Sequence, residues 1–179
     1  MRKRGFEVVE AYAEKNIHLP QRQTKTAAGY DFEAAEEIVL PSFWKLLFMY
    51  SLGQIKAFFD GAKCHEEEVD QLLKPRLVPT GIKAYMGDDE YLQLANRSSN
   101  PLKHRLILPN GVGIVDSDYY NNPNNEGHIQ FQLMNYGLRD YTIKKGERIG
   151  QGIFLPFLKA DGDQSVDRER TGGFGSSKR

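Results

Sequence analysis

The sequence predicts an all-β domain that carries one helical insertion. From residue 76 onward, short runs rich in β-branched and aromatic residues alternate with turn signals such as PTG, PNG and KKG. Residues 42–75 break this pattern, because their apolar residues recur at helical spacing. A chain of 179 residues, 40% of them apolar, is long enough for one packed core. We therefore expect a β-sandwich or barrel, formed as a single domain over residues 1–179.

The first 75 residues are expected to hold strands followed by two helices. Residues 5–12 (GFEVVEAY) read as a strand, and residues 26–40 (TAAGYDFEAAEEIVL) read as two short strands around a turn. Residues 42–60 predict a helix that ends at the following glycine. Residues 65–74 (HEEEVDQLLK) predict a second, short helix, because their acidic start and basic end suit the helix dipole.

The rest of the chain is expected to be strands and a tail. The polar, glycine-rich residues 161–179 have the composition of a flexible C-terminal arm. The strand-like runs before this arm cover residues 76–86, 90–99, 104–115, 127–137 and 141–158.

Composition excludes several classes of protein. Lys plus Arg and Asp plus Glu number 24 each, so nonspecific nucleic-acid binding is not expected to be the main activity. The single cysteine, Cys64, excludes an internal disulfide and a multi-cysteine zinc site, and its acidic neighbours favour an inert thiol. Ten uncharged residues between Lys45 and Lys56 are too few to span a bilayer, and Glu7 interrupts any signal sequence. We expect a soluble, cytoplasmic protein.

Four stretches combine glycine or small hydroxyl residues with a charged group, which suits a binding site better than a packed helix or strand. They are AAGYD (27–31), NRSS (96–99), NGVGIVDSDYY (110–120) and RTGGFGSS (170–177). Backbone N–H groups, serine hydroxyls and arginine together can bind phosphate, and the two aromatic residues Tyr119 and Phe174 can pack on a base or sugar. Each stretch alone is equally compatible with a turn, a cap or a linker. Together they suggest a nucleotide site.

These stretches, with GERIGQ at 146–151, resemble the five ordered motifs of the trimeric deoxyuridine triphosphatases (dUTPases). VPTGI at 78–82 also fits that family, and the resemblance covers about residues 5–40 and 76–177. It implies a jelly-roll-like β-barrel, a homotrimer with sites shared between subunits, and Mg²⁺-dependent hydrolysis of dUTP to dUMP and pyrophosphate. Residues 42–75 are then a two-helix insertion between the first and second motifs.

The resemblance also implies roles for two acidic residues. Asp116 of the third motif is expected to activate the attacking water, since that water must lose a proton as it attacks the α-phosphorus. Asp118 is a neighbour with no expected role. Asp31 of the first motif is expected to hold the Mg²⁺ through a water, because Mg²⁺ on a triphosphate keeps its waters and needs few protein ligands.

Substrate contacts follow from the same motifs. The resemblance implies that Asn110 and Gly113 read uracil from a β-hairpin, and that Tyr119 packs on the deoxyribose and leaves no room for a 2′-hydroxyl. Arg148 of the fourth motif is expected to be structural. The expected phosphate contacts of the second and fourth motifs are Arg97, Ser98, Ser99 and Gln151.

The fifth motif resembles an arm that closes over the site. Phe174 is expected to cover the uracil, Arg170 to reach the γ-phosphate and Ser176 to contact phosphate. Glu169 stands where the family usually has arginine, so either Arg168 or Arg170 supplies the cation.

Two alternatives remain open at this stage. The apolar stripe of the insertion (residues 42–75) either packs on the barrel or binds another protein. In the second case the chain is a nucleotide-binding regulatory protein that acts on a partner through the insertion. The related dCTP deaminases use a catalytic glutamate where this chain has Gln132, which cannot act as a general acid or base.

Overall fold

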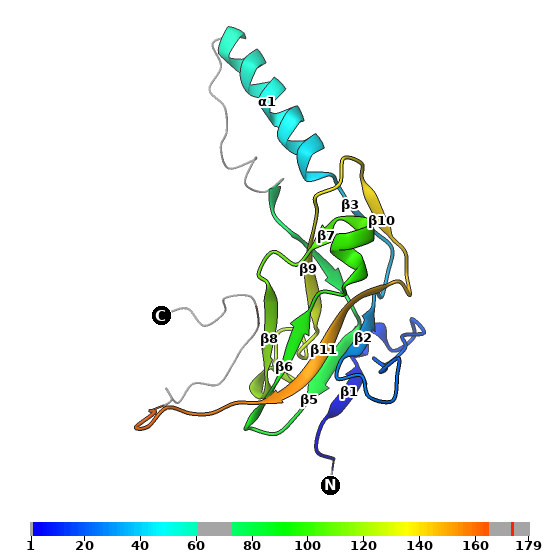
Figure 1. The fold of residues 1–179 in the computed structure, drawn as a ribbon, viewed down its shortest axis with the longest axis vertical. Coiled ribbons are helices and arrows are strands. Elements are labelled where there is room, and N and C mark those ends of the chain that lie inside the picture. The colour runs from blue at the N-terminus through cyan, green and yellow to red at the C-terminus, as the bar shows by residue number, and fades with distance from the viewer. Residues whose placement is uncertain (1, 61–72, 165–172, 174–179) are drawn as a thin grey trace.

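The computed structural model describes residues 2–60, 73–164 and 173, and Figure 1 shows a β-rich body from which one long helix projects. The helix is α1 (Phe43–Asp60). The strands of the first half are β1 (Gly5–Val8), β2 (Tyr30–Glu33), β3 (Ile38–Leu40), β4 (Arg76–Pro79), β5 (Ile82–Tyr85) and β6 (Glu90–Ala95). Those of the second half are β7 (Leu106–Ile107), β8 (Val112–Asp116), β9 (Gln130–Asn135), β10 (Tyr141–Ile143) and β11 (Arg148–Pro156). The expected all-β class with a helix after β3 is confirmed.

Antiparallel pairing joins strands that lie far apart in the chain. The largest sheet has the order β2-β11-β6-β8, and a second has the order β4-β9-β7. Two further pairs, β1-β5 and β3-β10, complete the described sheets. This pairing brings the first, second, third and fourth sequence motifs onto one sheet.

One hydrophobic core lies between the sheets. Alternate residues of β9 point inward, as the two-residue period of a strand requires, and Phe131 and Leu133 are fully buried. The Phe131 ring lies 5.6 Å from the Phe32 ring of β2, so the two larger sheets share this core. The face of the largest sheet that points away from this core is available for contacts outside it.

The first strand is shorter than predicted. Pairing with β5 ends at Val8, because the next N–H, of Val9, donates to the Gly81 carbonyl and the chain then turns through a 3-10 turn at Glu10–Tyr12. The sequence reading of residues 9–12 as strand was therefore wrong.

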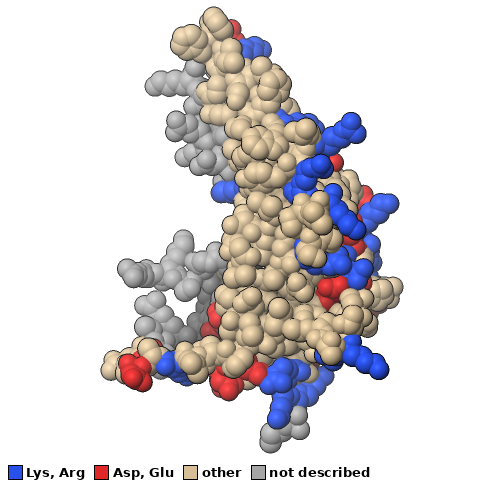
Figure 2. All heavy atoms as spheres, in the orientation of Figure 1, with Lys and Arg blue, Asp and Glu red and all other residues tan. Residues whose placement is uncertain are grey.

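Helix α1 does not pack its apolar stripe on the body. Ser42 caps its first turn, accepting from the Lys45 N–H, and Trp44 Nε1 donates to the Tyr136 carbonyl. Beyond this first turn the helix projects from the body, and none of its residues is buried (Figures 1 and 2). Phe58 and Phe59 are 81% and 80% exposed. Among the described residues, the stripe of α1 therefore does not pack on the sheets of this chain, which disfavours the first of the two alternatives for the insertion.

Some expectations fall on other parts of the chain. Cys64, residues 65–72 of the second predicted helix, and most of the C-terminal arm lie outside the described residues. No helix among residues 2–60 and 73–164 is both long and apolar enough to cross a membrane.

Candidate functional site

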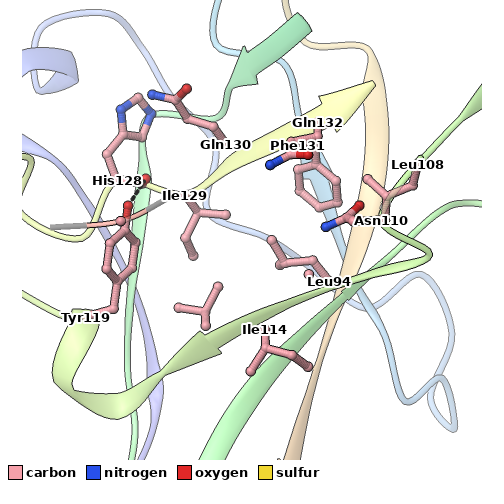
Figure 3. Close-up of a pocket in the computed structure, with 13 residues that line it drawn as sticks. Leu94, Leu108, Asn110, Ile114, Tyr119, His128, Ile129, Gln130, Phe131 and Gln132 are labelled. Atoms are coloured by element: carbon pink, nitrogen blue, oxygen red, sulfur yellow. Dashed lines mark hydrogen bonds between the residues drawn. The ribbon is translucent and has the colours of Figure 1, made fainter. Parts of the chain in front are cut away.

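A pocket of about 210 Å³ lies between β6, β8 and β9 (Figure 3). Its floor is apolar, and the amides of Asn110, Gln130 and Gln132 add polar atoms to the lining. A largely apolar cavity with a few placed polar groups is typical of a small-molecule site. The lining residues are Leu94, Leu108, Asn110, Gly113, Ile114, Val115, Tyr119, His128, Ile129, Gln130, Phe131, Gln132 and Gly173.

The turn between β7 and β8 positions two of the predicted residues. The Gly111 N–H donates to the Leu108 carbonyl, and the Val112 N–H donates to the Asn110 carbonyl, which closes a tight turn. Gly113 follows on β8, and a Cβ there would lie only 3.1 Å from the Leu94 Cβ. Asn110 and Gly113 therefore reach the same pocket, as the motif predicted.

Asp116 and Tyr119 follow on the same segment. Strand β8 ends at Asp116, which is exposed and comes directly after the lining residue Val115. A 3-10 turn at Ser117–Tyr119 then directs the Tyr119 ring into the pocket, where it is only 6% exposed. One short segment thus carries an exposed carboxylate and, three residues later, an aromatic ring that is buried in the pocket.

His128 is a lining residue that the sequence did not reveal. Its Nε2 accepts a hydrogen bond of 2.9 Å from the Gly81 N–H, and burial lowers the pKa of the ring. Both effects favour a neutral imidazole. A lone histidine after a polar loop gave no signal by which it could have been found.

A second group of predicted residues surrounds Asp31. Arg148 Nη1 lies 3.1 Å from Asp31 Oδ2, and Arg97 Nε lies 3.6 Å from Asp31 Oδ1. Gln151 is the partner of Asp31 in the β11–β2 register, and its Nε2 donates to the Asn96 carbonyl. Two guanidinium groups and an amide beside one carboxylate form a local anion-binding environment.

The two serines of the second motif lie beside this group. Ser98 is exposed and Ser99 is half-buried, and they directly follow Arg97. Asn100, which is buried, holds their turn to β11 through a 2.8 Å bond from Nδ2 to the Ile149 carbonyl. A π-helical turn at Asn100–His104 follows, where the sequence predicted no element over residues 100–103 and a strand from His104.

The Asp31 group and Asp116 lie far apart within the chain. Asp31, Gln151, Ala95 and Val112 form one row across the largest sheet, and Asp116 is four residues further along β8. Strands spaced about 4.8 Å apart and residues spaced about 3.3 Å apart put Asp31 and Asp116 about 20 Å from each other. On this estimate, Asp116 lies outside the group of side chains around Asp31.

The C-terminal arm is described at one position. Gly173 lines the pocket, and a Cβ there would lie 2.8 Å from the Tyr119 hydroxyl. Arg168, Arg170, Phe174 and Ser176 lie outside the described residues.

A metal would find few protein ligands. Among the described residues there is no group of three or more His, Cys, Asp or Glu side chains that could hold an ion. The Asp31 carboxylate, beside Arg97 and Arg148, is an oxygen donor of the kind that Mg²⁺ prefers.

Fold and site together define a β protein with a nucleoside-sized pocket and a separate anion-binding group. A family model for dUTPases matches residues 54–178. The chain is 45% identical over 178 residues to the deoxyuridine 5′-triphosphate nucleotidohydrolase of Lactococcus lactis subsp. lactis (strain IL1403), and the match covers 99% of each chain. It is 36% identical over 108 residues to the protein of that name from Photorhabdus laumondii, which covers 58% of this chain and 67% of the relative. The chain belongs to the dUTPase family.

Solved structures agree with this assignment. The crystal structure of the dUTPase from Streptococcus mutans matches with a TM-score of 0.68 and 41% identity, over 88% of this chain and 99% of that one. The dUTPase of phage phi11 of S. aureus, 16% identical, shares the fold with a TM-score of 0.62 over 94% of this chain and 99% of that one. A mutant of that phage enzyme was solved with a structural Mg(II) ion. The fold is accordingly the all-β, jelly-roll type.

Proposed function

We propose that this protein hydrolyses dUTP to dUMP and pyrophosphate. The observation that carries the proposal is the segment from Asn110 to Tyr119, which brings three expected base and sugar contacts into one pocket and puts Asp116 directly after its lining. Membership of the dUTPase family supports the same substrate.

The pocket would bind the nucleoside half of the substrate. Asn110 and the Gly113 backbone would hydrogen-bond the uracil edge, and Gly113 leaves room for this because it carries no side chain. The Tyr119 ring would pack on the deoxyribose. A close fit excludes the thymine methyl and the 2′-hydroxyl by steric overlap, which discriminates more strongly than the loss of a favourable contact.

Asp116 would act as the general base. It is exposed at the end of β8, so water can reach its carboxylate. The carboxylate would take a proton from that water as the oxygen attacks the α-phosphorus. The bond from that phosphorus to the bridging oxygen then breaks, and pyrophosphate leaves. A positioned base of this kind contributes about 10²–10⁴-fold to the rate.

The second group would hold the triphosphate. Arg97 and Gln151 present N–H donors beside Asp31, and the hydroxyls of Ser98 and Ser99 follow directly in the chain. A bound Mg²⁺ would neutralise negative charge on the phosphates, and Asp31 would hold it through a water. Arg148 fixes the Asp31 carboxylate, which suits the structural role expected for it.

The arm would close the site over the substrate. Gly173 already lies against Tyr119 at the pocket, which would place Phe174 over the base. Arg170, or Arg168 in its place, would then reach the γ-phosphate, and Ser176 would add a phosphate contact. Closure of this kind excludes water from the reaction.

The separation of Asp31 and Asp116 supports a homotrimer with shared sites. A separation of about 20 Å within one chain favours a site to which different subunits contribute the phosphate group and the base. The edge strand β8 is suited to such contacts, because Val112 is 42% exposed there.

A substrate panel tests the proposed activity. Pyrophosphate release from dUTP, dTTP, dCTP and UTP in the presence of Mg²⁺ should be fast for dUTP alone. Ammonia release from dCTP would indicate deamination instead. We do not expect it, because Gln132, which lines the pocket, cannot act as a general acid or base. Binding of dUTP without turnover would contradict the enzyme assignment.

A second candidate function is binding of a partner protein through residues 42–75. It is favoured by the exposed apolar side chains of α1, among them Phe48, Leu52, Ile55 and Phe59. Replacing Phe48 and Phe59 by glutamate should leave turnover of dUTP intact and abolish partner capture. Loss of turnover in that variant would argue that the helix serves the enzyme itself.

A further inference from the structure

The loop at residues 120–128 forms a polar network that joins two lining residues of the pocket, Tyr119 and His128. Asn122 is buried; its Nδ2 donates to the Tyr119 carbonyl and to Asn125 Oδ1, both over 2.8 Å. Its Oδ1 accepts from the N–H groups of Asn124 and Asn125. The asparagine-rich sequence, which had the composition of an ordinary turn, is thus ordered by its own side chains.

Asn125 connects this network to the Tyr119 ring. Its Oδ1 accepts from Gly127 N–H and from Asn122 Nδ2, so its amide nitrogen must point the other way. That nitrogen donates to the Tyr119 hydroxyl over 2.8 Å. The hydroxyl in turn donates to the His128 carbonyl over 3.1 Å, the dashed line in Figure 3. The ring is therefore held at its far end from two sides.

The loop itself is fixed to the body at several points. Lys83, only 9% exposed, donates from Nζ to Asn121 Oδ1 over 2.7 Å, and the Glu10 N–H donates to Glu126 Oε2 over 2.7 Å. The Tyr120 hydroxyl donates to Glu7 Oε2 over 2.6 Å. These bonds to β1, β5 and the turn after β1 make the loop a firm support rather than a mobile rim.

We infer that Asn125 is a positioning residue that sets the sugar specificity of the site. The inference rests on the proposed function, in which Tyr119 packs on the deoxyribose. A ring that is fixed at its hydroxyl cannot tilt away from the sugar, so the space that a 2′-hydroxyl needs stays closed. Without the Asn125 bond, the ring gains freedom and that space opens.

The test is the ratio of kcat/KM for dUTP to kcat/KM for UTP. In Asn125→Ala this ratio should fall about tenfold, the factor that one lost hydrogen bond of ordinary strength allows. Tyr119→Phe keeps the ring but removes the hydroxyl, and with it the bonds to both Asn125 and His128, so it should lower the ratio at least as much. Because Tyr119→Phe already removes the bond to Asn125, adding Asn125→Ala to it should cause little further loss. Tyr119→Phe also tests the inference if Asn125→Ala does not fold.

A matched control lies in the same loop. Asn124 is exposed and contributes only its backbone N–H to the network, so Asn124→Ala should keep the wild-type ratio. A merely structural role for Asn125 would lower turnover of both nucleotides equally and leave the ratio unchanged. An unchanged ratio in Asn125→Ala and Tyr119→Phe, or an equal fall in Asn124→Ala, would overturn the inference.

Calorimetric binding of dUMP and UMP separates this inference from the proposed activity. If the wild type binds dUMP without hydrolysing dUTP, the proposed function fails. The ratio of the dissociation constant of UMP to that of dUMP, measured in the same variants, then still tests Asn125. We expect that ratio to fall as the ratio of kcat/KM does. Equal binding of dUMP and UMP by the wild type would overturn the inference.

Discussion

The Arg148 guanidinium of β11 donates a 3.1 Å hydrogen bond to the Asp31 carboxylate of β2, which joins the fourth sequence motif to the first. The Asp31 side chain is 14% exposed and that of Arg148 is 42% exposed. An ion pair that water can reach on one side contributes little to stability. The ion pair instead fixes the position of the Asp31 carboxylate within the anion-binding group.

Replacing Asp31 by asparagine should weaken the response to Mg²⁺ without unfolding the protein. We expect a several-fold rise in the Mg²⁺ concentration for half-maximal turnover, and loss of turnover with EDTA in both proteins. Glu33→Gln is the control, since Glu33 lies on the same strand but pairs with His18. An unchanged Mg²⁺ dependence in Asp31→Asn would contradict the role of Asp31.

Replacing Gly29 by alanine should mimic the loss of Gln151. A Cβ on Gly29 would lie 2.3 Å from Gln151 Oε1, so the flexible amide must move. Both Gly29→Ala and Gln151→Ala should raise the KM for dUTP about tenfold, the cost of one lost charge-assisted hydrogen bond, with a smaller change in kcat. Steady-state kinetics on dUTP checks this. A wild-type KM in Gln151→Ala would remove Gln151 from the phosphate site.

The sequence predicted which residues meet at the site better than it predicted what supports them. Asn110, Gly113 and Tyr119 converge on one pocket because their spacing is fixed by a hairpin and the turn that follows it. Asp31 and Gln151 come together only through the β2–β11 register, which neither composition nor the period of the strands reveals. These contacts depend on pairing between distant strands.

The supporting contacts gave no periodic signal. Asn125 and His128 act through single hydrogen bonds within and beside a polar loop, and any turn contains such residues. Helix α1 was predictable because its apolar residues recur at helical spacing, and this spacing is a local property of the sequence. Its direction is determined by contacts at Ser42 and Trp44 that only the folded chain shows.

Stability should fall in mild acid because of His128. Burial lowers the pKa of this ring below its ordinary value of 6.5, and it outweighs the nearby carboxylates of Glu36 and Glu126. The unfolded chain therefore binds a proton more readily. The stabilisation is complete above about pH 6.5 and is lost as the pH falls from there toward the lowered pKa. His128→Gln keeps an acceptor for the Gly81 N–H and should flatten the melting temperature between pH 7.5 and 5. An equally steep decline in that variant would exclude His128 as the cause.

Gly127 should tolerate no side chain. Its φ is +81°, and a Cβ would lie 2.5 Å from the Tyr119 carbonyl oxygen. Gly127→Ala should therefore destabilise the protein by about 1–3 kcal/mol in urea unfolding. Gly53→Ala is the matched control, because nothing lies within 4 Å of that position and alanine is favoured inside a helix by about 1 kcal/mol. Equal effects at the two positions would contradict the close packing of the loop.

The central claim is that Asp116 is the base in dUTP hydrolysis. Single-turnover pyrophosphate release by the wild type and Asp116→Asn tests it most directly, with dUTP binding measured on both and Asp118→Asn as the neighbouring control. The account predicts that Asp116→Asn binds dUTP but releases pyrophosphate about 10²–10⁴-fold more slowly, while Asp118→Asn stays near the wild-type rate. Wild-type turnover in Asp116→Asn would contradict it.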